Sequence, residues 1–296
     1  MRRGMRTFGD ATIDTITDLD PFALPIDLLF PGRTVADLRE YETVLSPHHV
    51  DFGTARILLG VHSHLLRIGG RNILIDTCIG EHKPRPRRAD DWHQRRGSGY
   101  LERLAAHGLR PDDIDMVLCT HLHADHVGWN TKLVDGRWVP TFPNARYLVG
   151  KQEFTHWRDA ENKAPGQHNH GSFIDSVMPI LEAEQLDLVD ADAEIADGIS
   201  LKPLSGHSPG QIGLCLCHGQ QKAIFCADAI HSVVQVYHPD WVSRFCSDQE
   251  MAIATRMELL NESADNGTIL IPAHLRHFSG MRIKRVGSNF VPEFVT

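Results

Sequence analysis

The chain has 296 residues, of which 42% are hydrophobic and 23% charged, values that are ordinary for a globular protein. Its 38 acidic residues outnumber its 30 basic residues, so the formal net charge is −8; this excludes a general nucleic-acid binder, because phosphate contacts need an excess of Lys and Arg. No run of about 18 apolar residues is present, so no transmembrane helix is predicted. The N-terminal stretch MRRGMRTFGDATIDTITDLD lacks the apolar segment of a secretory signal peptide. We therefore expect a cytoplasmic protein whose six cysteines stay reduced.

In the first third of the chain, the residue pattern changes near Ala55. Residues 1–50 are rich in Pro, Asp and Leu, and this composition predicts an irregular arm with short elements. Beyond it, apolar runs over Ile57–Ile68 and Asn72–Thr77 flank Gly69–Gly70, a pattern typical of two strands joined by a tight turn. The basic stretch at 85–96 also contains acidic residues, Asp90 and Asp91, which favours a solvated loop over an RNA contact.

The remaining elements alternate between strands and helices. Strands are expected over 115–120, 146–149, 199–204, 212–217, 222–226 and 268–271. Helices are expected over 98–107, 151–158 and 247–263, and a terminal hairpin over 281–294. Because the strands are joined both by tight turns and by helices, the sequence predicts mixed sheets with helices outside them.

The 19 histidines are unusually many, and their positions indicate metal binding. His121-Leu122-His123-Ala124-Asp125-His126 follows the predicted strand at 115–120. In an extended segment, side chains two positions apart point the same way, so His121 and His123 can bind one ion together. As the chain turns, Asp125 and His126 can reach a second ion beside it.

Three further candidate ligands each lie just past a predicted strand, where loops carry ligands on a rigid scaffold. His207 stands in SGHSPG, Asp228 in FCAD and His274 in IPAH. Imidazole and carboxylate groups suit Zn²⁺, and also Mn²⁺, Fe²⁺ or Co²⁺.

The motifs HLHADH, SGHSPGQ, FCADA and PAHL resemble those of the metallo-β-lactamase-fold hydrolases, and ILIDT, which contains Asp76, is similar to the family's first motif. The resemblance covers roughly residues 55–280. It implies an α/β fold, a four-layer αββα sandwich of two mixed β-sheets flanked by helices. We expect one domain over 1–296, with an arm at 1–50 and a catalytic core at 55–280. Two divalent ions are implied, most simply zinc, with these ligands: His121, His123 and His207 for the first ion, Asp125, His126 and His274 for the second, and Asp228 bridging the two.

The resemblance also implies an activity. A hydroxide shared by the two ions would attack the substrate, and Asp125 would pass a proton to the leaving group. N-acyl homoserine lactonases carry a tyrosine three residues after the bridging aspartate, where this chain has His231; we expect this imidazole to donate a hydrogen bond to the substrate without binding metal. The segment Ile230–Val236 is more similar to the methyl parathion hydrolase-like branch.

The expected substrate is therefore a small-molecule ester or lactone. Phosphotriester hydrolysis using the same hydroxide is the competing enzymatic hypothesis. A mononuclear-iron protein similar to the persulfide dioxygenases is the hypothesis from another class. We expect no nucleic-acid or membrane partner, and the sequence leaves a homodimer open.

Overall fold

The computed structural model describes residues 6–88 and 91–295, which group into two compact units. Unit 1 comprises the described parts of Met1–Leu19 and Val61–Asp190, and unit 2 those of Asp20–Gly60 and Ala191–Thr296. The first five residues of the predicted arm and Asp90 of the basic stretch lie outside the described residues. Within the described ranges, no helix is both long and apolar enough to span a bilayer. The single domain over 1–296 stays a prediction.

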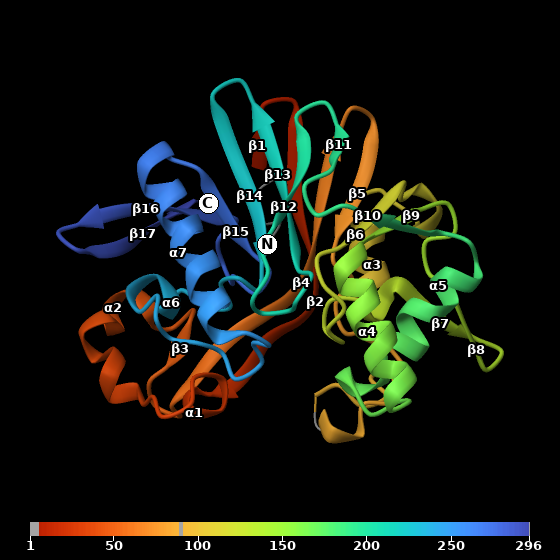
Figure 1. Cartoon of the computed structure of the whole chain (residues 1–296), viewed down its shortest axis with the longest axis horizontal. Helices are drawn as coiled ribbons and strands as arrows, with labels where there is room; N and C mark the ends of the chain where they lie inside the picture. Colours follow the sequence, from red (N-terminus) through yellow and green to blue (C-terminus); the bar gives the residue numbers. More distant parts are fainter. Residues whose placement is uncertain (1–5, 89–90, 296) are drawn as a thin grey trace. The chain divides into compact units, whose positions relative to one another are not determined.

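The first mixed sheet supplies most strands of unit 1 (Figure 1). Its order is β1-β2-β4-β5-β6-β9-β10, and β3 pairs with β4. The pair β4–β5 is antiparallel, whereas β5, β6, β9 and β10 run parallel to one another. The strand bounds are β1 Arg6–Phe8, β2 Ala11–Pro25, β3 Val50–Asp51, β4 Arg56–Ile68, β5 Arg71–Ile75, β6 Met116–Cys119, β9 Arg146–Gly150 and β10 Leu186–Val189.

Parallel neighbours need crossover connections, and unit 1 provides them with helices. The chain passes through α3 between β5 and β6, and through α4 between β9 and β10. A short antiparallel pair, β7–β8, lies between β6 and β9 in the sequence. The bounds are η2 Pro86–Arg88, α3 Tyr100–Ala106, η3 Pro111–Asp113, η4 Gly128–Asn130, β7 Thr131–Val134, β8 Arg137–Pro140, α4 Lys151–Lys163, η5 Asn169–Gly171, η6 Phe173–Val177 and α5 Met178–Glu182.

The second mixed sheet belongs to unit 2 and follows the sequence order from β11 to β17. All its neighbours are antiparallel except β14 and β15, which run parallel around the connecting helix α7. The bounds are α1 Ile26–Leu29, η1 Val35–Tyr41, α2 Glu42–Leu45, β11 Glu194–Ala196, β12 Ile199–Pro203, β13 Ile212–His218, β14 Gln221–Ala227, α6 Val234–Tyr237, α7 Gln249–Asn266, β15 Ile269–Pro272, β16 Gly280–Val286 and β17 Asn289–Val295.

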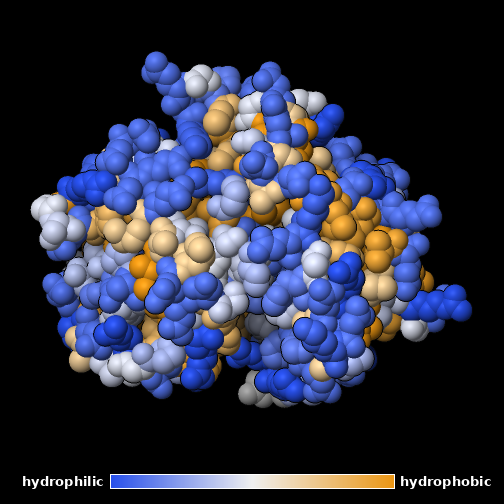
Figure 2. Space-filling view, in the orientation of Figure 1, coloured by the Kyte–Doolittle hydropathy of each residue, from blue (hydrophilic) through white to orange (hydrophobic). Residues whose placement is uncertain are grey.

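Helix α7 covers this sheet through an apolar core. Leu259 and Leu260 pack with Ile224 of β14 and Leu270 of β15 in a buried cluster. Asp248 caps the helix by accepting a hydrogen bond from the backbone N–H of Met251 at 2.9 Å, and Gly267 ends it in the left-handed conformation. On the molecular face shown in Figure 2, hydrophilic residues predominate and hydrophobic residues show between them in smaller patches.

The predicted mixed α/β class is confirmed, and the strands expected after Ala55, the long helix and the terminal hairpin are present. The irregular arm over 1–50 is wrong for Ala11–Pro25, which form the 15-residue strand β2. Asp18 of this strand is buried, and its carboxylate binds the Arg95 guanidinium at 2.9 Å. This partner lies 77 residues away and leaves no local signal.

The solvated loop predicted at 85–96 is also wrong at its first residue. Arg85 is fully buried and donates to both carboxylate oxygens of Asp175, at 2.5 and 2.8 Å. Lys83, just before it, is buried as well and approaches Asp175 Oδ1 at 3.6 Å. The basic residues at the start of this segment therefore hold two parts of unit 1 together.

Two backbone segments of unit 1 approach each other very closely beside the histidine motif. The backbone N–H of Thr77 donates to His126 O at 2.6 Å, and those of Gly128 and Trp129 donate to Cys78 O and Thr77 O at 2.7 Å. A Cβ atom added to Gly128 would lie 1.8 Å from Ile79 O. Only glycine fits this position without displacing the backbone.

Replacing Gly128 by alanine is therefore expected to destabilise unit 1. Backbone displacement at a well-packed position should lower the free energy of unfolding by about 2–3 kcal/mol, measured by urea denaturation. Gly53→Ala is the matched control, because its Cβ would meet only the Asp51 side chain at 3.3 Å. Equal denaturation midpoints for Gly128→Ala and the wild type would contradict the close approach.

Candidate metal centre

In each unit, two adjacent parallel strands end at residues of the site, whereas His207 follows the antiparallel strand β12. In unit 1, β5 leads into Asp76 and the neighbouring β6 leads into Thr120 and His121. In unit 2, β14 leads into Asp228 and the neighbouring β15 leads towards His274. The carboxyl ends of parallel neighbours meet at the same sheet edge, so residues far apart in sequence are brought together there.

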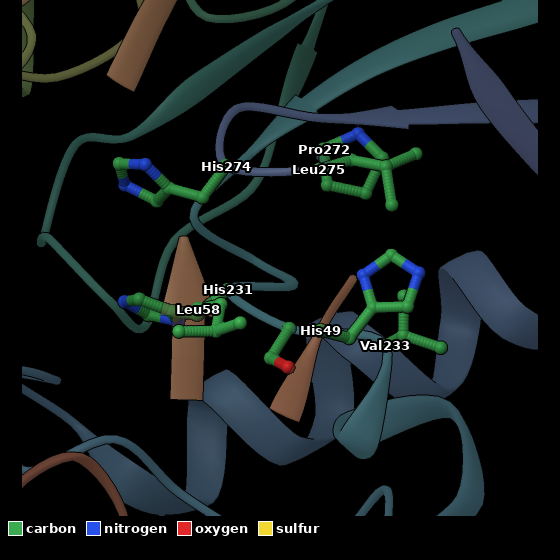
Figure 3. A pocket seen from close by; sticks show the side chains of 8 residues that line it. His49, Leu58, His231, Val233, Pro272, His274 and Leu275 are labelled. Atoms are coloured by element: carbon green, nitrogen blue, oxygen red, sulfur yellow. The ribbon is translucent and has the colours of Figure 1, made fainter. Parts of the chain in front are cut away.

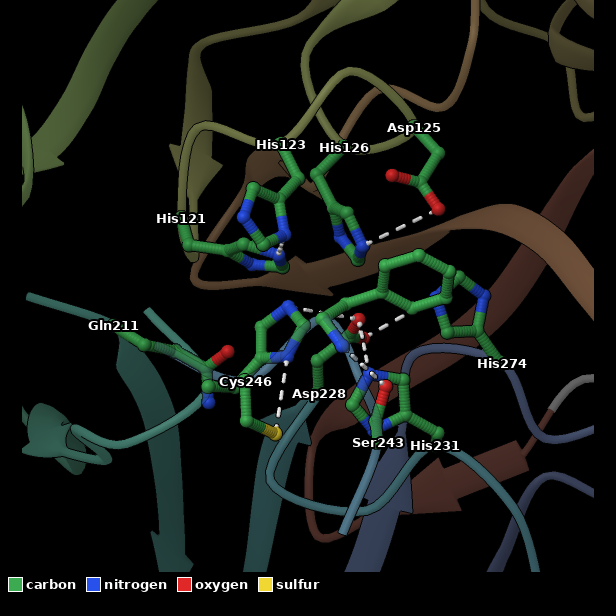
Figure 4. Close-up of polar contacts among 12 residues, drawn as sticks. His121, His123, Asp125, His126, Gln211, Asp228, His231, Ser243, Cys246 and His274 are labelled. Atoms are coloured by element: carbon green, nitrogen blue, oxygen red, sulfur yellow. Dashed lines mark hydrogen bonds and ion pairs between the residues drawn. The ribbon is translucent and has the colours of Figure 1, made fainter. Parts of the chain in front are cut away.

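The unit 1 cluster consists of the four polar residues of the histidine motif: His121, His123, Asp125 and His126 (Figure 4). His121 Nε2 and His123 Nδ1 lie 3.1 Å apart, and His126 Nε2 lies 3.9 Å from Asp125 Oδ2. His121 and His126 are buried, whereas His123 and Asp125 are partly exposed. Two nitrogens bound to one tetrahedral Zn²⁺ are separated by about 3.3 Å, so the His121–His123 spacing suits a shared ion.

Asp76 orients two rings of this cluster. Its carboxylate accepts from His126 Nδ1 at 2.8 Å and from the Thr120 hydroxyl at 2.8 Å. Because that hydroxyl uses its proton on Asp76, it accepts from His121 Nδ1, which lies 3.1 Å away. Both imidazoles therefore carry their proton on Nδ1 and present the Nε2 lone pair, the arrangement that metal-ligating histidines need.

The loop between the histidines is also held by its backbone. The N–H of Leu122 donates to the buried carboxylate of Glu153 at 3.0 Å, and the N–H of Ala124 donates to Asn169 Oδ1 at 3.0 Å. Glu153 belongs to α4 and Asn169 to η5. The loop is thus fixed on two sides before any ligand binds.

The unit 2 cluster places three imidazoles around one carboxylate (Figure 4). His207 Nε2 and His231 Nε2 lie 3.4 and 3.3 Å from Asp228 Oδ2, and His274 Nε2 lies 3.2 Å from Oδ1. All four residues are buried. His207, Asp228 and His231 form a group whose donor atoms are close enough to hold a metal ion together.

Two of these rings have an identified contact on the opposite nitrogen. His274 Nδ1 donates to the backbone carbonyl of Gly60 at 2.8 Å. His207 Nδ1 lies 3.7 Å from Cys246 Sγ, and burial raises the pKa of this thiol to about 12, so the sulfur stays uncharged. Both rings thus turn Nε2 toward Asp228.

The loop that carries His207 is seated on the start of α7. Gly206 has a φ of +130°, and a Cβ atom there would lie 2.4 Å from the backbone nitrogen of Ala252. Its carbonyl accepts from the N–H of Asp248, and the carbonyl of His207 accepts from the N–H of Ser247, both at 2.9 Å. Two backbone hydrogen bonds therefore join the start of the helix to the loop that carries the candidate ligand.

These hydrogen bonds create contacts in which two acceptors face each other. With its proton on Nδ1, neutral His274 points a lone pair at an Asp228 oxygen 3.2 Å away. His126 points a lone pair toward Asp125 in the same way. Such pairs repel unless a cation or a second ring proton lies between them, so the donor set fits divalent metal ions.

His231 was predicted to contact substrate. In the structure its Nε2 lies 3.3 Å from Asp228, between the values of the predicted ligands His207, at 3.4 Å, and His274, at 3.2 Å. Its backbone N–H donates to Gln235 Oε1 at 2.8 Å, and Gln235 in turn donates to the carbonyl of Trp241. This buried glutamine fixes the turn that follows Asp228.

A cavity of about 10 Å³, the size of one water molecule, lies beside the unit 2 cluster (Figure 3). His231, His274 and His49 all line it. His49 is buried, and burial lowers its pKa to about 3, so its imidazole is neutral. No sequence motif singles out His49.

The structure thus gathers the predicted site residues into one cluster per unit, and it adds supporting residues that the sequence did not reveal: Thr120, Gly60, Cys246 and Gln235. Apart from Thr120, which precedes His121, they carry no local signal. Asp76 was noted only through its motif. The assignment of ligands to a first and a second ion stays a prediction.

Comparison with known proteins agrees with this arrangement. The family model of the metallo-beta-lactamase superfamily matches residues 56–274. The N-acyl homoserine lactonase AiiB of Agrobacterium fabrum strain C58 is 27% identical over 187 residues. That alignment covers 59% of this chain and 64% of AiiB, so the chain spans less than two thirds of this relative's length.

Solved structures share the fold over nearly the whole chain. AidC, a dizinc quorum-quenching lactonase, has a TM-score of 0.76 and 23% identity, covering 98% of this chain and 96% of AidC. The hydrolase AbOPH has a TM-score of 0.78 and 22% identity, with the same coverage of both chains.

The family model spans all four ligand motifs, from before HLHADH to His274, and the solved structures carry the same fold. The chain belongs to the metallo-beta-lactamase superfamily.

Proposed function

We propose that this chain is a metal-dependent hydrolase that opens small lactones and cleaves related esters. The observation that carries the proposal is the pair of acceptor-to-acceptor contacts, His274 to Asp228 and His126 to Asp125, at 3.2 and 3.9 Å. Family membership and the lactonase relatives AiiB and AidC support the choice of substrate class.

Following the family resemblance, we propose that the clusters of the two units serve one dinuclear centre. Unit 1 would provide His121, His123, Asp125 and His126, and unit 2 would provide His207, Asp228 and His274. Two divalent ions would supply a nucleophile from water at neutral pH and would polarise the substrate carbonyl. Zinc is the simplest choice, and Mn²⁺, Fe²⁺ or Co²⁺ suits the same donors.

The protein's own groups have separate tasks in this proposal. Asp76 and Gly60 hold the ring protons on Nδ1, so the Nε2 lone pairs stay available. Asp228 would supply negative charge to both ions. Asp125, which is partly exposed, would pass a proton to the leaving oxygen. His231 is expected to donate a hydrogen bond to the substrate carbonyl or leaving oxygen.

A hydrolysis screen tests the activity directly. The metal-loaded chain is expected to hydrolyse acyl homoserine lactones or simple lactones with a kcat/KM of at least about 10⁴ M⁻¹s⁻¹, followed by proton release. Aryl esters and phosphotriesters serve as comparison substrates, and a chelator-treated sample as the control. Turnover that survives chelation would contradict metal dependence, and turnover of phosphotriesters alone would replace the lactone assignment.

Replacing Asp228 by alanine should remove metal and activity while leaving the fold intact. Without this carboxylate the ions would face each other with less negative charge between them. Elemental analysis is expected to find two ions per wild-type chain and fewer in the variant, whose circular dichroism spectrum should be unchanged. Asp240→Ala is the matched control, since Asp240 is exposed and its contact with Arg33 spans 3.8 Å.

Wild-type turnover in Asp228→Ala would refute the bridging role. A wild-type content of one iron ion per chain, after supplementation with zinc or manganese, would instead favour the mononuclear-iron hypothesis. Cytoplasmic location and oligomeric state stay predictions.

The role of His231 is tested by metal content beside kinetics. His231→Ala is expected to keep its full metal content and to lose about tenfold to a hundredfold in kcat/KM, which corresponds to about 1.4–2.7 kcal/mol. The loss should be below that of a full oxyanion donor, because the ions carry most of the charge. His218→Ala, at the exposed end of β13, is the control.

The outcome separates two roles that the 3.3 Å contact with Asp228 leaves open. Loss of an ion from His231→Ala would make His231 a metal ligand. Unchanged kinetics would reduce it to a packing residue.

A further inference from the structure

Unit 1 contains a second cavity, about 370 Å³ in volume, which the hydrolytic proposal does not use. This volume falls within the range of small-molecule sites, roughly 300–1,000 Å³. Trp138, Ile174, Pro84 and Pro86 form apolar parts of its lining, and Arg87 and His170 form polar parts. Ile174 is 47% exposed, so it offers apolar surface to a ligand in the cavity.

The inner side of this cavity is rigidly built. Arg85 donates to both oxygens of Asp175, which lines the cavity, and also to the carbonyl of His170 at 3.0 Å. Lys83 lies 3.6 Å from the centre of the Trp138 ring and donates to Thr131 Oγ1 at 2.5 Å. These contacts fix Trp138 and the 170–175 segment before a ligand arrives, which lowers the entropic cost of binding.

Charges of both signs surround the cavity. Lys83, Arg85, Arg87 and Arg88 belong to the adjoining segment, and the nearby acids on the packed elements are Asp175, Glu161 and Asp125. Asp175 serves both buried cations, and Glu161 accepts from the N–H of Gly166. Burial lowers the pKa of Lys83 to about 7, with Asp175 opposing the shift and Arg85 adding to it, so this side chain is in part uncharged.

Arg87 is the cation placed to meet a ligand. It is exposed, it lines the cavity, and its contacts with Gln167 O and Oε1 are long, at 3.5 and 3.4 Å. A guanidinium has five N–H donors, so it can bind a planar anion in a bidentate manner while keeping these weak contacts.

We propose that this cavity binds an amphipathic anion, whose apolar body lies against Trp138 and Ile174 and whose carboxylate or phosphate is held by Arg87. The site is distinct from the unit 1 cluster, but the two are linked. Asn169 and Ser172, which flank the lining residues His170 and Gly171, bind the backbone of Ala124 and Leu122 at 3.0 and 3.3 Å. A ligand in the cavity therefore contacts the segment that holds the histidine loop.

Isothermal titration calorimetry of the metal-loaded chain tests the proposal with octanoate and octyl phosphate. Both are expected to bind with dissociation constants of about 1 mM or tighter, and octan-1-ol and octylammonium to bind at least about tenfold more weakly. Arg87→Glu and Ile174→Asp should each weaken octanoate binding at least about tenfold, because they remove the charge and the apolar contact separately. Both residues are exposed, so neither change should impair folding.

Arg71→Glu is the matched control, an exposed charge reversal on β5 that should leave the affinity within about twofold. Octanoate bound at the metal ligands instead would be unaffected by Arg87→Glu, and that result would overturn the proposal. Equal binding of octan-1-ol would overturn it as well. The calorimetric readout needs no turnover, so its outcome is separate from that of the hydrolysis screen.

Discussion

The structure depends on a property of imidazole: a neutral ring carries one proton, and the acceptor that receives it decides which nitrogen is left as a donor to metal. Asp76 in unit 1 and the carbonyl of Gly60 in unit 2 receive that proton from His126 and His274. Both acceptors stand on strands of the first sheet or directly after them. The sheets thereby set the tautomers, and the tautomers set the direction in which the lone pairs point.

The candidate ligands could be proposed from the sequence because they lie in short motifs at strand ends. HLHADH follows β6, and Asp228 follows β14, so local patterns were sufficient to find them. The supporting contacts could not be found in the same way, because their partners are remote. Asp76 binds a ring 50 residues away, and the bond between His274 and Gly60 spans 214 residues.

The two errors have the same physical origin. Arg85 was expected to lie in a solvated loop, since burying a lone charge is costly, and Asp18 lies in a segment that was expected to be irregular. Each is buried because it meets an opposite charge, 90 residues away for Arg85 and 77 residues away for Asp18. Composition describes a segment, whereas burial of charge depends on pairs that only the tertiary fold creates.

The hydrogen bonds between the His207 loop and the start of α7 couple the local motions of these two segments. The carbonyls of Gly206 and His207 accept from Asp248 and Ser247, at the point where the helix begins. Any fluctuation that frays the first turn of α7 also frees the His207 loop. If His207 binds an ion as proposed, its release would pass through that opening, and metal occupancy would then change together with the amide-exchange protection of the first helical turn. The free energy of local opening at the helix cap would in that case limit how long the ion is retained.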